Sequence, residues 1–191
     1  YKNHLVFFDV GSPPKKSFSK RYQSGPLSFE YFLDGTKIIS NSGFGNNISN
    51  KAELLSRLTA CQSTLTLNDT SVSEFERNKL INKIFGHSIK NSFKTYVVNI
   101  KNEQNLISCS AEHNGYEKNF GCTHKREILF DKENNYLKGT DHIFKKKDGI
   151  PIRYIFRFHI NPELSVVKTM SGNGALIQLS KNKSLIFTVS D

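Results

Sequence analysis

The chain has 191 residues, of which 37% are hydrophobic and 23% are charged, as in an ordinary soluble globular domain. This length suffices for one well-buried core, so we expect a single domain over residues 1–191. No apolar run approaches the roughly 18 residues that a membrane-spanning helix needs, so we expect no membrane partner. The formal net charge of +10 favours an acidic partner, although a solvated lysine-rich surface accounts for it equally well.

The cysteines and the first residue add two further expectations. Cys61, Cys109 and Cys122 are odd in number, and their spacings fit neither a disulfide framework nor a zinc site. We therefore expect buried thiols. The chain begins at Tyr1 without a basic-then-apolar leader, so we expect a fragment or processed piece whose localisation cannot be read from it.

In chain order, the first clear element is a run of alternating apolar and polar residues over 27–33, which predicts a strand with one face on a core. The dipeptide Asp34-Gly35 follows it and favours a tight hairpin turn. Residues 50–57 carry a short apolar stripe behind Asn50, so they predict a short helix capped by that residue.

The segment over residues 73–85 is ambiguous. Ser73 is followed by Glu76 in the spacing of a capping box, which favours a helix, but the segment is polar enough to form a long loop. We therefore expect one or two short helices in the whole chain.

In the C-terminal half, apolar and polar residues again alternate. Residues 152–160 alternate in the manner of one continuous strand, and Asp148-Gly149 in front of them favours another hairpin turn. Asn134-Asn135 and Asn173-Gly174 mark further turns. About a dozen short strands at regular spacing predict an all-β fold, an antiparallel β-sandwich.

Four phrases of the sequence stand in the order and spacing of a known family. They are Lys20–Glu30 with the following 35–43, Thr59–Leu67, Ala111–Gly121 with His124 and Arg126, and Arg157–Pro162. Together they resemble the C-terminal β-domain of the heparinase II/III-like polysaccharide lyases and cover most of residues 5–165. The least similar part is 71–94.

The resemblance implies a β-sandwich that follows an (α/α) toroid domain absent from this chain. Members of that family cleave uronic-acid-containing polysaccharides by β-elimination, in which a base removes the proton α to the carboxylate and an acid protonates the leaving oxygen. The acid/base tyrosine lies mostly on the toroid. The resemblance therefore implies a domain that supplies a wall of the substrate cleft and charge neutralisation, is inactive when isolated, and belongs to a periplasmic or exported protein. The implied partners are an anionic polysaccharide and the upstream toroid.

The sequence departs from the family at the positions where the family carries histidines that contact substrate or bind a metal. The histidines of the family fall on Arg21, Gln23 and Gln62, and an acidic or amide position falls on Asn41. Zinc is held by imidazole, thiolate or carboxylate, so Gln23, Asn41 and Gln62 are not expected to form the metal site, and no cofactor is expected. Arg21 instead supplies a permanent cation that can pair with a carboxylate but cannot transfer a proton.

The remaining histidines have structural as well as functional interpretations. His159 lies beside two arginines on a predicted strand, where a hydrogen-bonded structural histidine is favoured over a ligand contact. His113 precedes Asn-Gly and is expected in a turn. If their strands belong to one meander, His124 and Arg126 share a basic sheet face with Arg153 and Arg157. Such a face is either a docking surface for an anionic polysaccharide or an acidic partner domain, or plain solvent surface. The candidate substrate-binding residues are Arg21, Gln23, Gln62 and His159.

Two other classes of function stay open at this point. One is a non-catalytic carbohydrate-binding or structural β-sandwich that has lost the histidines and metal site of the family. The other is nucleic-acid binding, which only the net charge favours. The sequence lacks a basic stretch interleaved with aromatic residues and any known nucleic-acid-binding module, so no nucleic-acid partner is expected.

Overall fold

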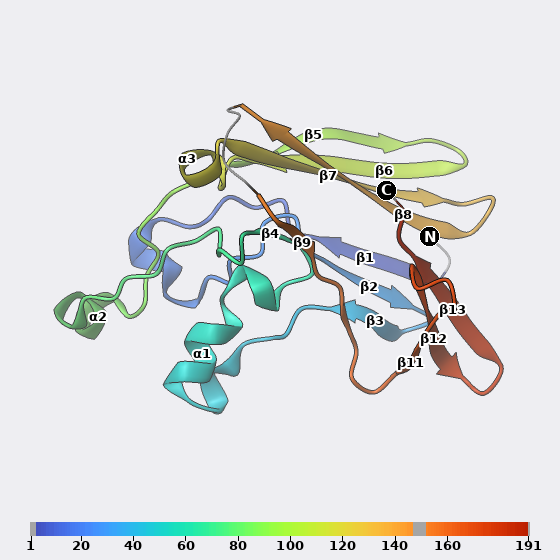
Figure 1. Ribbon diagram of the computed structural model, residues 1–191, viewed down its shortest axis with the longest axis horizontal. Helices are drawn as coiled ribbons and strands as arrows, with labels where there is room; N and C mark the ends of the chain where they lie inside the picture. Colours follow the sequence, from blue (N-terminus) through green and yellow to red (C-terminus); the bar gives the residue numbers. More distant parts are fainter. Residues whose placement is uncertain (1–2, 147–151, 191) are drawn as a thin grey trace.

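The computed structural model describes residues 3–146 and 152–190 and shows an antiparallel β-sandwich, as the sequence predicts (Figure 1). The strands are β1 (His4–Phe8), β2 (Phe29–Leu33), β3 (Thr36–Ser40), β4 (Leu65–Leu67), β5 (Thr95–Asn102), β6 (Leu106–His113), β7 (Cys122–Asp131), β8 (Tyr136–Lys145), β9 (Tyr154–Phe156), β10 (His159–Ile160), β11 (Ser165–Lys168), β12 (Gly174–Ser180) and β13 (Lys183–Thr188). The helices are α1 (Asn50–Ser56), α2 (Lys79–Phe85) and α3 (Glu117–Phe120), with 3-10 turns η1 (Lys16–Arg21), η2 (Gly45–Asn47) and η3 (Thr59–Cys61).

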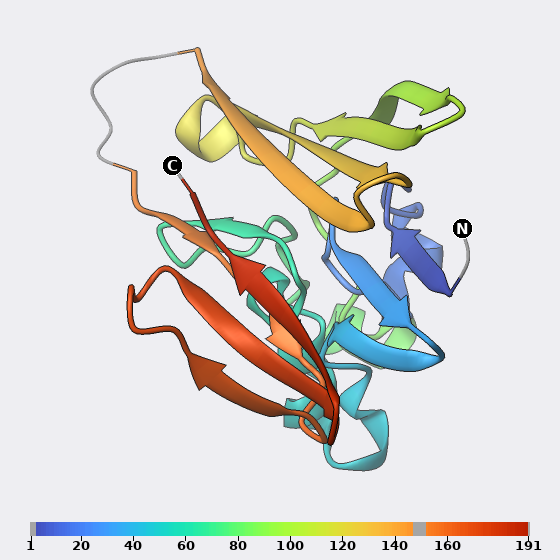
Figure 2. The same cartoon turned by 90° about the vertical axis from the view of Figure 1, so that its right-hand side faces the viewer.

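These strands form four antiparallel sheets. Two have four strands, in the orders β1-β2-β3-β10 and β5-β6-β7-β8. A third joins β11, β12 and β13, and the short strands β4 and β9 pair with each other. The β5–β8 sheet lies over the β1–β3 strands, and the β11–β13 sheet closes the side of the sandwich (Figures 1 and 2).

The main hydrophobic core lies where these three larger sheets meet. Its buried residues come from β2 and β3, from Ile128 on β7 and from Ile177 on β12. A second cluster lies between β4 and the β5–β8 sheet and includes Leu65, Leu67 and Tyr116. The second core therefore attaches β4 to the opposite sheet.

The hairpin between β2 and β3 confirms the turn predicted at Asp34-Gly35. Both residues have positive φ, 52° and 77° respectively. A two-residue turn with both central residues in this region matches the twist of the strands it connects, and Asp-Gly adopts it at little cost. The pair of residues predicted at Asp148-Gly149 lies outside the described part of the chain.

The segment 152–160 is not the single strand that its alternation predicts. Residues Tyr154–Phe156 pair with β4, whereas His159 and Ile160 pair with β3 in a different sheet. The backbone N–H of Arg157 donates to the carbonyl of Thr64 at 3.1 Å, where the chain crosses between its two partners. Alternation of apolar and polar residues indicates only which face of a strand is buried, so it cannot show that the chain changes its pairing partner.

Both helical predictions hold in part. α1 forms where expected, but its cap is Ser49, whose Oγ accepts from the N–H of Ala52 at 3.1 Å. In the ambiguous segment, only Lys79–Phe85 is helical, and Asn78 caps it. Glu76 cannot serve a capping box there, because its Oε1 accepts from the N–H groups of the two residues that follow it.

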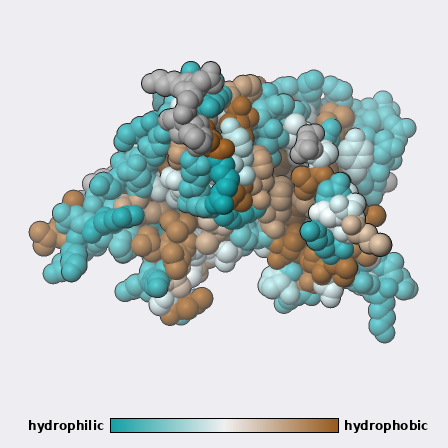
Figure 3. All heavy atoms as spheres, in the orientation of Figure 1, coloured by the Kyte–Doolittle hydropathy of each residue, from teal (hydrophilic) through white to brown (hydrophobic). Residues whose placement is uncertain are grey.

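The surface and the thiols complete the description. Hydrophilic residues cover much of the face in Figure 3, and apolar atoms show at several places on it, among them the region of the β11–β13 sheet. On α2, Leu80 and Ile84 are exposed. Within the described residues, no helix is long and apolar enough to cross a membrane. Cys122 is the buried free thiol that was expected, whereas Cys61 and Cys109 are only half-buried.

Candidate functional site

Two of the four family-like phrases meet as neighbouring loops. The first loop, residues 21–28, leads into β2, and the second, residues 59–64, leads into β4. The hydroxyls of Ser24 and Thr59 lie 3.1 Å apart, and Thr64 Oγ1 donates to the carbonyl of Pro26 at 2.9 Å. We call these segments the first and second site loops.

The first site loop contains a strained turn at Leu27. The N–H of Ser28 donates to the carbonyl of Gly25 at 2.9 Å, and Leu27 has a φ of 59°. Because proline fixes a negative φ at position 26, the turn is type II, in which the third residue is normally glycine or asparagine. A buried leucine in this conformation is uncommon and persists only where surrounding contacts enforce it.

The two loops also approach each other closely at Gly25. A Cβ atom there would lie 2.8 Å from Cγ of Gln62 and 2.9 Å from Oγ of Ser28. Gln62 is only 1% exposed, so its side chain fills the space that a larger residue at position 25 would occupy. Glycine is therefore required for the contact between the loops.

We expect Gly25→Ala to lower the free energy of unfolding by about 1–3 kcal/mol, because the added methyl group must displace the packed Gln62 side chain. Gly139→Ala on β8 is the matched control, since nothing lies within 4 Å of a Cβ added there. Denaturant titration of both variants checks this expectation. Equal stabilities would contradict the close approach of the loops.

The four candidate substrate-binding residues have different exposures. Arg21 is exposed at the end of η1, and Gln23 is half-buried with its Nε2 donating to the carbonyl of Gly43 at 2.9 Å. Gln62 is buried and donates to the carbonyl of Ser56 at 2.9 Å. His159 is half-buried, and its Nε2–H donates to the carbonyl of Ala60 at 3.1 Å.

The amide positions are already used in hydrogen bonds within the protein. Asn41 Oδ1 accepts from the N–H of Ser63 at 2.8 Å, and Gln23 and Gln62 donate to carbonyls as described above. Neutral amides committed in this way do not fit the requirements of zinc. Within residues 3–146 and 152–190, no group of three or more His, Cys, Asp and Glu side chains could hold a metal ion.

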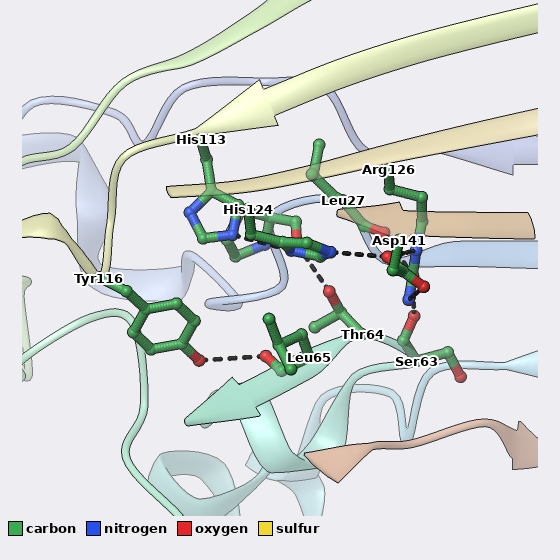
Figure 4. Close-up of polar contacts among 10 residues, drawn as sticks. Leu27, Ser63, Thr64, Leu65, His113, Tyr116, His124, Arg126 and Asp141 are labelled. Carbon is green, nitrogen blue, oxygen red and sulfur yellow. Dashed lines mark hydrogen bonds and ion pairs between the residues drawn. The ribbon is translucent and has the colours of Figure 1, made fainter. Parts of the chain in front are cut away.

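A buried ionic cluster underlies the two loops, as Figure 4 shows. Arg126 on β7 is 1% exposed, and its Nε and Nη2 donate to the two carboxylate oxygens of Asp141 on β8 at 2.7 and 3.0 Å. His124 Nε2 donates to the same carboxylate at 2.6 Å. The Nη1 of Arg126 reaches the carbonyls of Leu27 and Ser63, at 2.8 and 2.9 Å.

A chain of hydrogen bonds extends this cluster to a second histidine. The N–H of Gly115 donates to His113 Nδ1, so the proton of a neutral His113 lies on Nε2. That nitrogen lies 3.3 Å from His124 Nδ1, which can accept it while His124 Nε2–H donates to Asp141. These contacts accommodate both imidazoles in the neutral form, each in one tautomer.

The pKa shifts follow from burial and these contacts. Burial lowers the pKa of His113 well below 6.5, and the neighbouring His124 and Arg126 lower it further. Burial also lowers the pKa of His124, although the hydrogen bond to Asp141 opposes this shift. Burial alone would raise the pKa of Asp141, but hydrogen bonds from His124 and Arg126 and the charge of Arg126 lower it to about 2.

The structure corrects two predictions for these residues. His113 is not in a turn, because it ends β6 with 1% exposure and packs against Phe93 and Tyr116. His124 and Arg126 do not lie on an exposed basic face, because they project into the interior of the sandwich.

The two arginines expected on that same face lie elsewhere. Arg153 and Arg157 both form ion pairs with Asp69, beside the β4–β9 pair. These four side chains therefore do not form one basic sheet face. Arg157 is also anchored by a hydrogen bond to the hydroxyl of Thr66.

The accessible part of the site is suited to binding an anion. Arg21 offers a permanently charged, fork-shaped donor at the start of the first site loop. Gln23 lies two residues further along and is partly exposed. Such groups can orient and neutralise a carboxylate or sulfate, but neither is a proton-transfer group at neutral pH.

The comparisons with known proteins agree with the resemblance carried by the four phrases. A family model described as heparinase II/III-like, C-terminal, matches residues 2–191. Among curated proteins, none matches the sequence significantly.

Solved structures share the fold. A mutant of the heparan sulfate lyase HepC from Pedobacter heparinus has a TM-score of 0.71 and 16% sequence identity, over 96% of this chain and 25% of that chain. A heparinase III structure has a TM-score of 0.68 and 15% identity over the same shares. A further heparinase III, with methylated lysines, has a TM-score of 0.59 and 18% identity over 82% of this chain and 21% of that chain.

The chain therefore spans about a quarter of the length of the first two solved structures. Their low sequence identity makes them evidence of fold alone, while the family model covers nearly every residue of the chain. On this evidence, the chain belongs to the family of heparinase II/III-like C-terminal domains.

Proposed function

We propose that this domain binds a uronic-acid-containing anionic polysaccharide at the two site loops. In the complete protein it forms one wall of a lyase cleft and neutralises substrate charge. The family supports this proposal, as do the similar structures, whose names describe a heparan sulfate lyase and heparinase III. The observation that carries it is the exposed Arg21 at the start of the first site loop.

The proposed chemistry divides between this domain and an upstream toroid domain. In β-elimination, negative charge develops on the uronate when the adjacent proton is removed, so a cation held at the carboxylate lowers the barrier. Arg21 supplies that cation here. The base and the acid belong to the toroid in this proposal, and the domain alone turns over no substrate.

A second candidate is a carbohydrate-binding or structural domain without a part in catalysis. One observation favours it: the polar groups of Asn41, Gln62 and His159 are bonded to the protein itself. These side chains then hold the loops in shape, and binding relies on Arg21 and Gln23. The lyase wall and the carbohydrate-binding domain place the anionic ligand at the same loops, whereas a purely structural domain binds none, so binding experiments separate the structural form from the other two.

We expect Arg21→Ala to weaken heparin binding by about 1 kcal/mol or more, because the guanidinium makes fork-shaped contacts to a carboxylate or sulfate. Lys138→Ala removes one exposed charge from β8 and should change binding by only a few tenths of a kcal/mol. Lys138 is a better control than Lys146, which forms an ion pair with Glu117 at 2.6 Å.

Titration calorimetry at one fixed ionic strength measures both variants. Equal losses of binding free energy from the two substitutions would mean that heparin is held only by nonspecific attraction between charges. Such attraction acts over about 8–10 Å at physiological salt. That result would remove Arg21 from the site.

A further inference from the structure

One side chain of the opposite sheet contacts both site loops. Arg126 donates from a single nitrogen, Nη1, to the carbonyl of Leu27 at 2.8 Å and to the carbonyl of Ser63 at 2.9 Å. The two carbonyls are 36 positions apart in the sequence and belong to different loops. Because the guanidinium is buried, water cannot readily replace either hydrogen bond.

The orientation of that guanidinium is fixed from behind. Asp141 accepts from Nε and Nη2, and this fork leaves Nη1 directed at the loops (Figure 4). The carboxylate is in turn held by His124 Nε2 at 2.6 Å. A planar guanidinium paired in this way cannot rotate without breaking two charged hydrogen bonds.

Both contacted carbonyls lie at points that control the loops. Leu27 has the strained φ of the type II turn, and its carbonyl is fixed by Arg126 while its N–H donates to Asp9. An unfavourable leucine conformation of this kind requires such enforcement.

Ser63 is the corresponding point of the second site loop. Its N–H donates to Asn41, its Oγ accepts from the N–H of His159, and it directly follows Gln62. A shift of Ser63 would therefore move Asn41, His159 and Gln62 together.

We propose that Arg126 and Asp141 are positioning residues, which fix the two site loops relative to each other so that Arg21 and Gln23 face the ligand in one geometry. The relevance of this geometry to ligand binding rests on the proposed function. The loop fixation itself does not, and it can be measured without any ligand.

Arg126→Lys tests the proposal with charge retained. A lysine ammonium is a point donor, so it can pair with Asp141 but cannot also span the carbonyls of Leu27 and Ser63. Ile177→Ala on β12 is the control, because it destabilises the core without touching either site loop. Asp141→Asn is the second variant, to be used if Arg126→Lys does not fold.

Amide hydrogen exchange followed by NMR gives the first measurement. We expect the amides of Gly25, Leu27, Ser28 and residues 62–64 to exchange about tenfold faster in Arg126→Lys, relative to the amides of β12. In Ile177→Ala the ratio between these two sets should stay the same or move in the opposite direction. An unchanged ratio in Arg126→Lys and Asp141→Asn would overturn the proposal.

Heparin affinity gives the second measurement, at a temperature where every variant is folded. We expect Arg126→Lys to bind about fivefold more weakly than the wild type and Ile177→Ala to bind within twofold of it. Equal affinity of wild type and Arg126→Lys would overturn the link between loop fixation and binding. Absence of heparin binding in the wild type would instead refute the proposed function, while the exchange result would still decide whether Arg126 fixes the loops.

Discussion

Arg126→Met should lower the free energy of unfolding by about 3–5 kcal/mol, the largest loss that we expect from any single substitution in this domain. The methionine fills most of the volume but leaves the Asp141 carboxylate without its cation. It also leaves the carbonyls of Leu27 and Ser63 without their donor in the interior. Breaking one side of a buried ion pair costs far more than the pair itself contributes.

Chemical denaturation of Arg126→Met and Lys125→Met measures this difference. Lys125 is the neighbouring residue on β7 and points to the opposite, outward face, so its loss should change stability by no more than about 0.5 kcal/mol. A loss below about 1 kcal/mol in Arg126→Met would mean that water or another group satisfies the carboxylate and the two carbonyls.

Stability should also fall as the pH is lowered from 7 to 5, by up to about 2 kcal/mol from His113, whose folded-state pKa lies well below 6.5, with a further loss from His124. The unfolded chain takes up protons near the ordinary histidine pKa of 6.5, whereas the folded-state pKa values of His113 and His124 are lowered. The unfolded state therefore binds more protons in this range, so folding becomes less favourable. Above about pH 6.5 this loss of stability is absent, because the histidines of the unfolded chain are then largely neutral.

A second, more acidic loss follows from Asp141. Its folded pKa of about 2 lies below the ordinary value of 3.8, so its contribution is present above 3.8 and is lost as the pH falls towards 2. Denaturation curves at a series of pH values show both ranges.

A substitution identifies the histidine contribution. His113→Gln should reduce the slope of stability against pH between 7 and 5, because one fewer group takes up a proton on unfolding. Ile177→Ala should lower stability equally at each pH and leave the slope unchanged. A wild-type stability that is constant over this range would contradict the buried, neutral histidines.

The sequence predicted the fold because the fold depends on local patterns. Alternation over residues 27–33 and the Asp34-Gly35 turn determine the β2–β3 hairpin, and both features are visible in a few adjacent residues. The change of partner within 152–160 could not be predicted in this way. It depends on contacts with Thr64 and Ser63, which are almost a hundred residues away in the sequence.

The sequence does not predict the buried cluster, because charged residues in proteins usually lie at the surface. A signal was nevertheless present: Ile128 and Phe130 face the core, and counting back by twos along β7 places Arg126 and His124 on the same face. The partner that makes this burial tolerable is Asp141, on the next strand of the hairpin. Pairing between strands decides whether an inward arginine is tolerated, and it cannot be read from one strand alone.

The proposal that the two site loops bind an anionic polysaccharide is tested most directly by NMR titration of the domain with a heparin-derived oligosaccharide. A neutral dextran oligosaccharide of equal length is the control. We expect chemical-shift changes from heparin to cluster in residues 20–28 and 59–64, to weaken with salt, and to be absent with dextran. Changes spread over the outward lysines of the β5–β8 sheet, or equal changes from both sugars, would contradict a binding site at these loops.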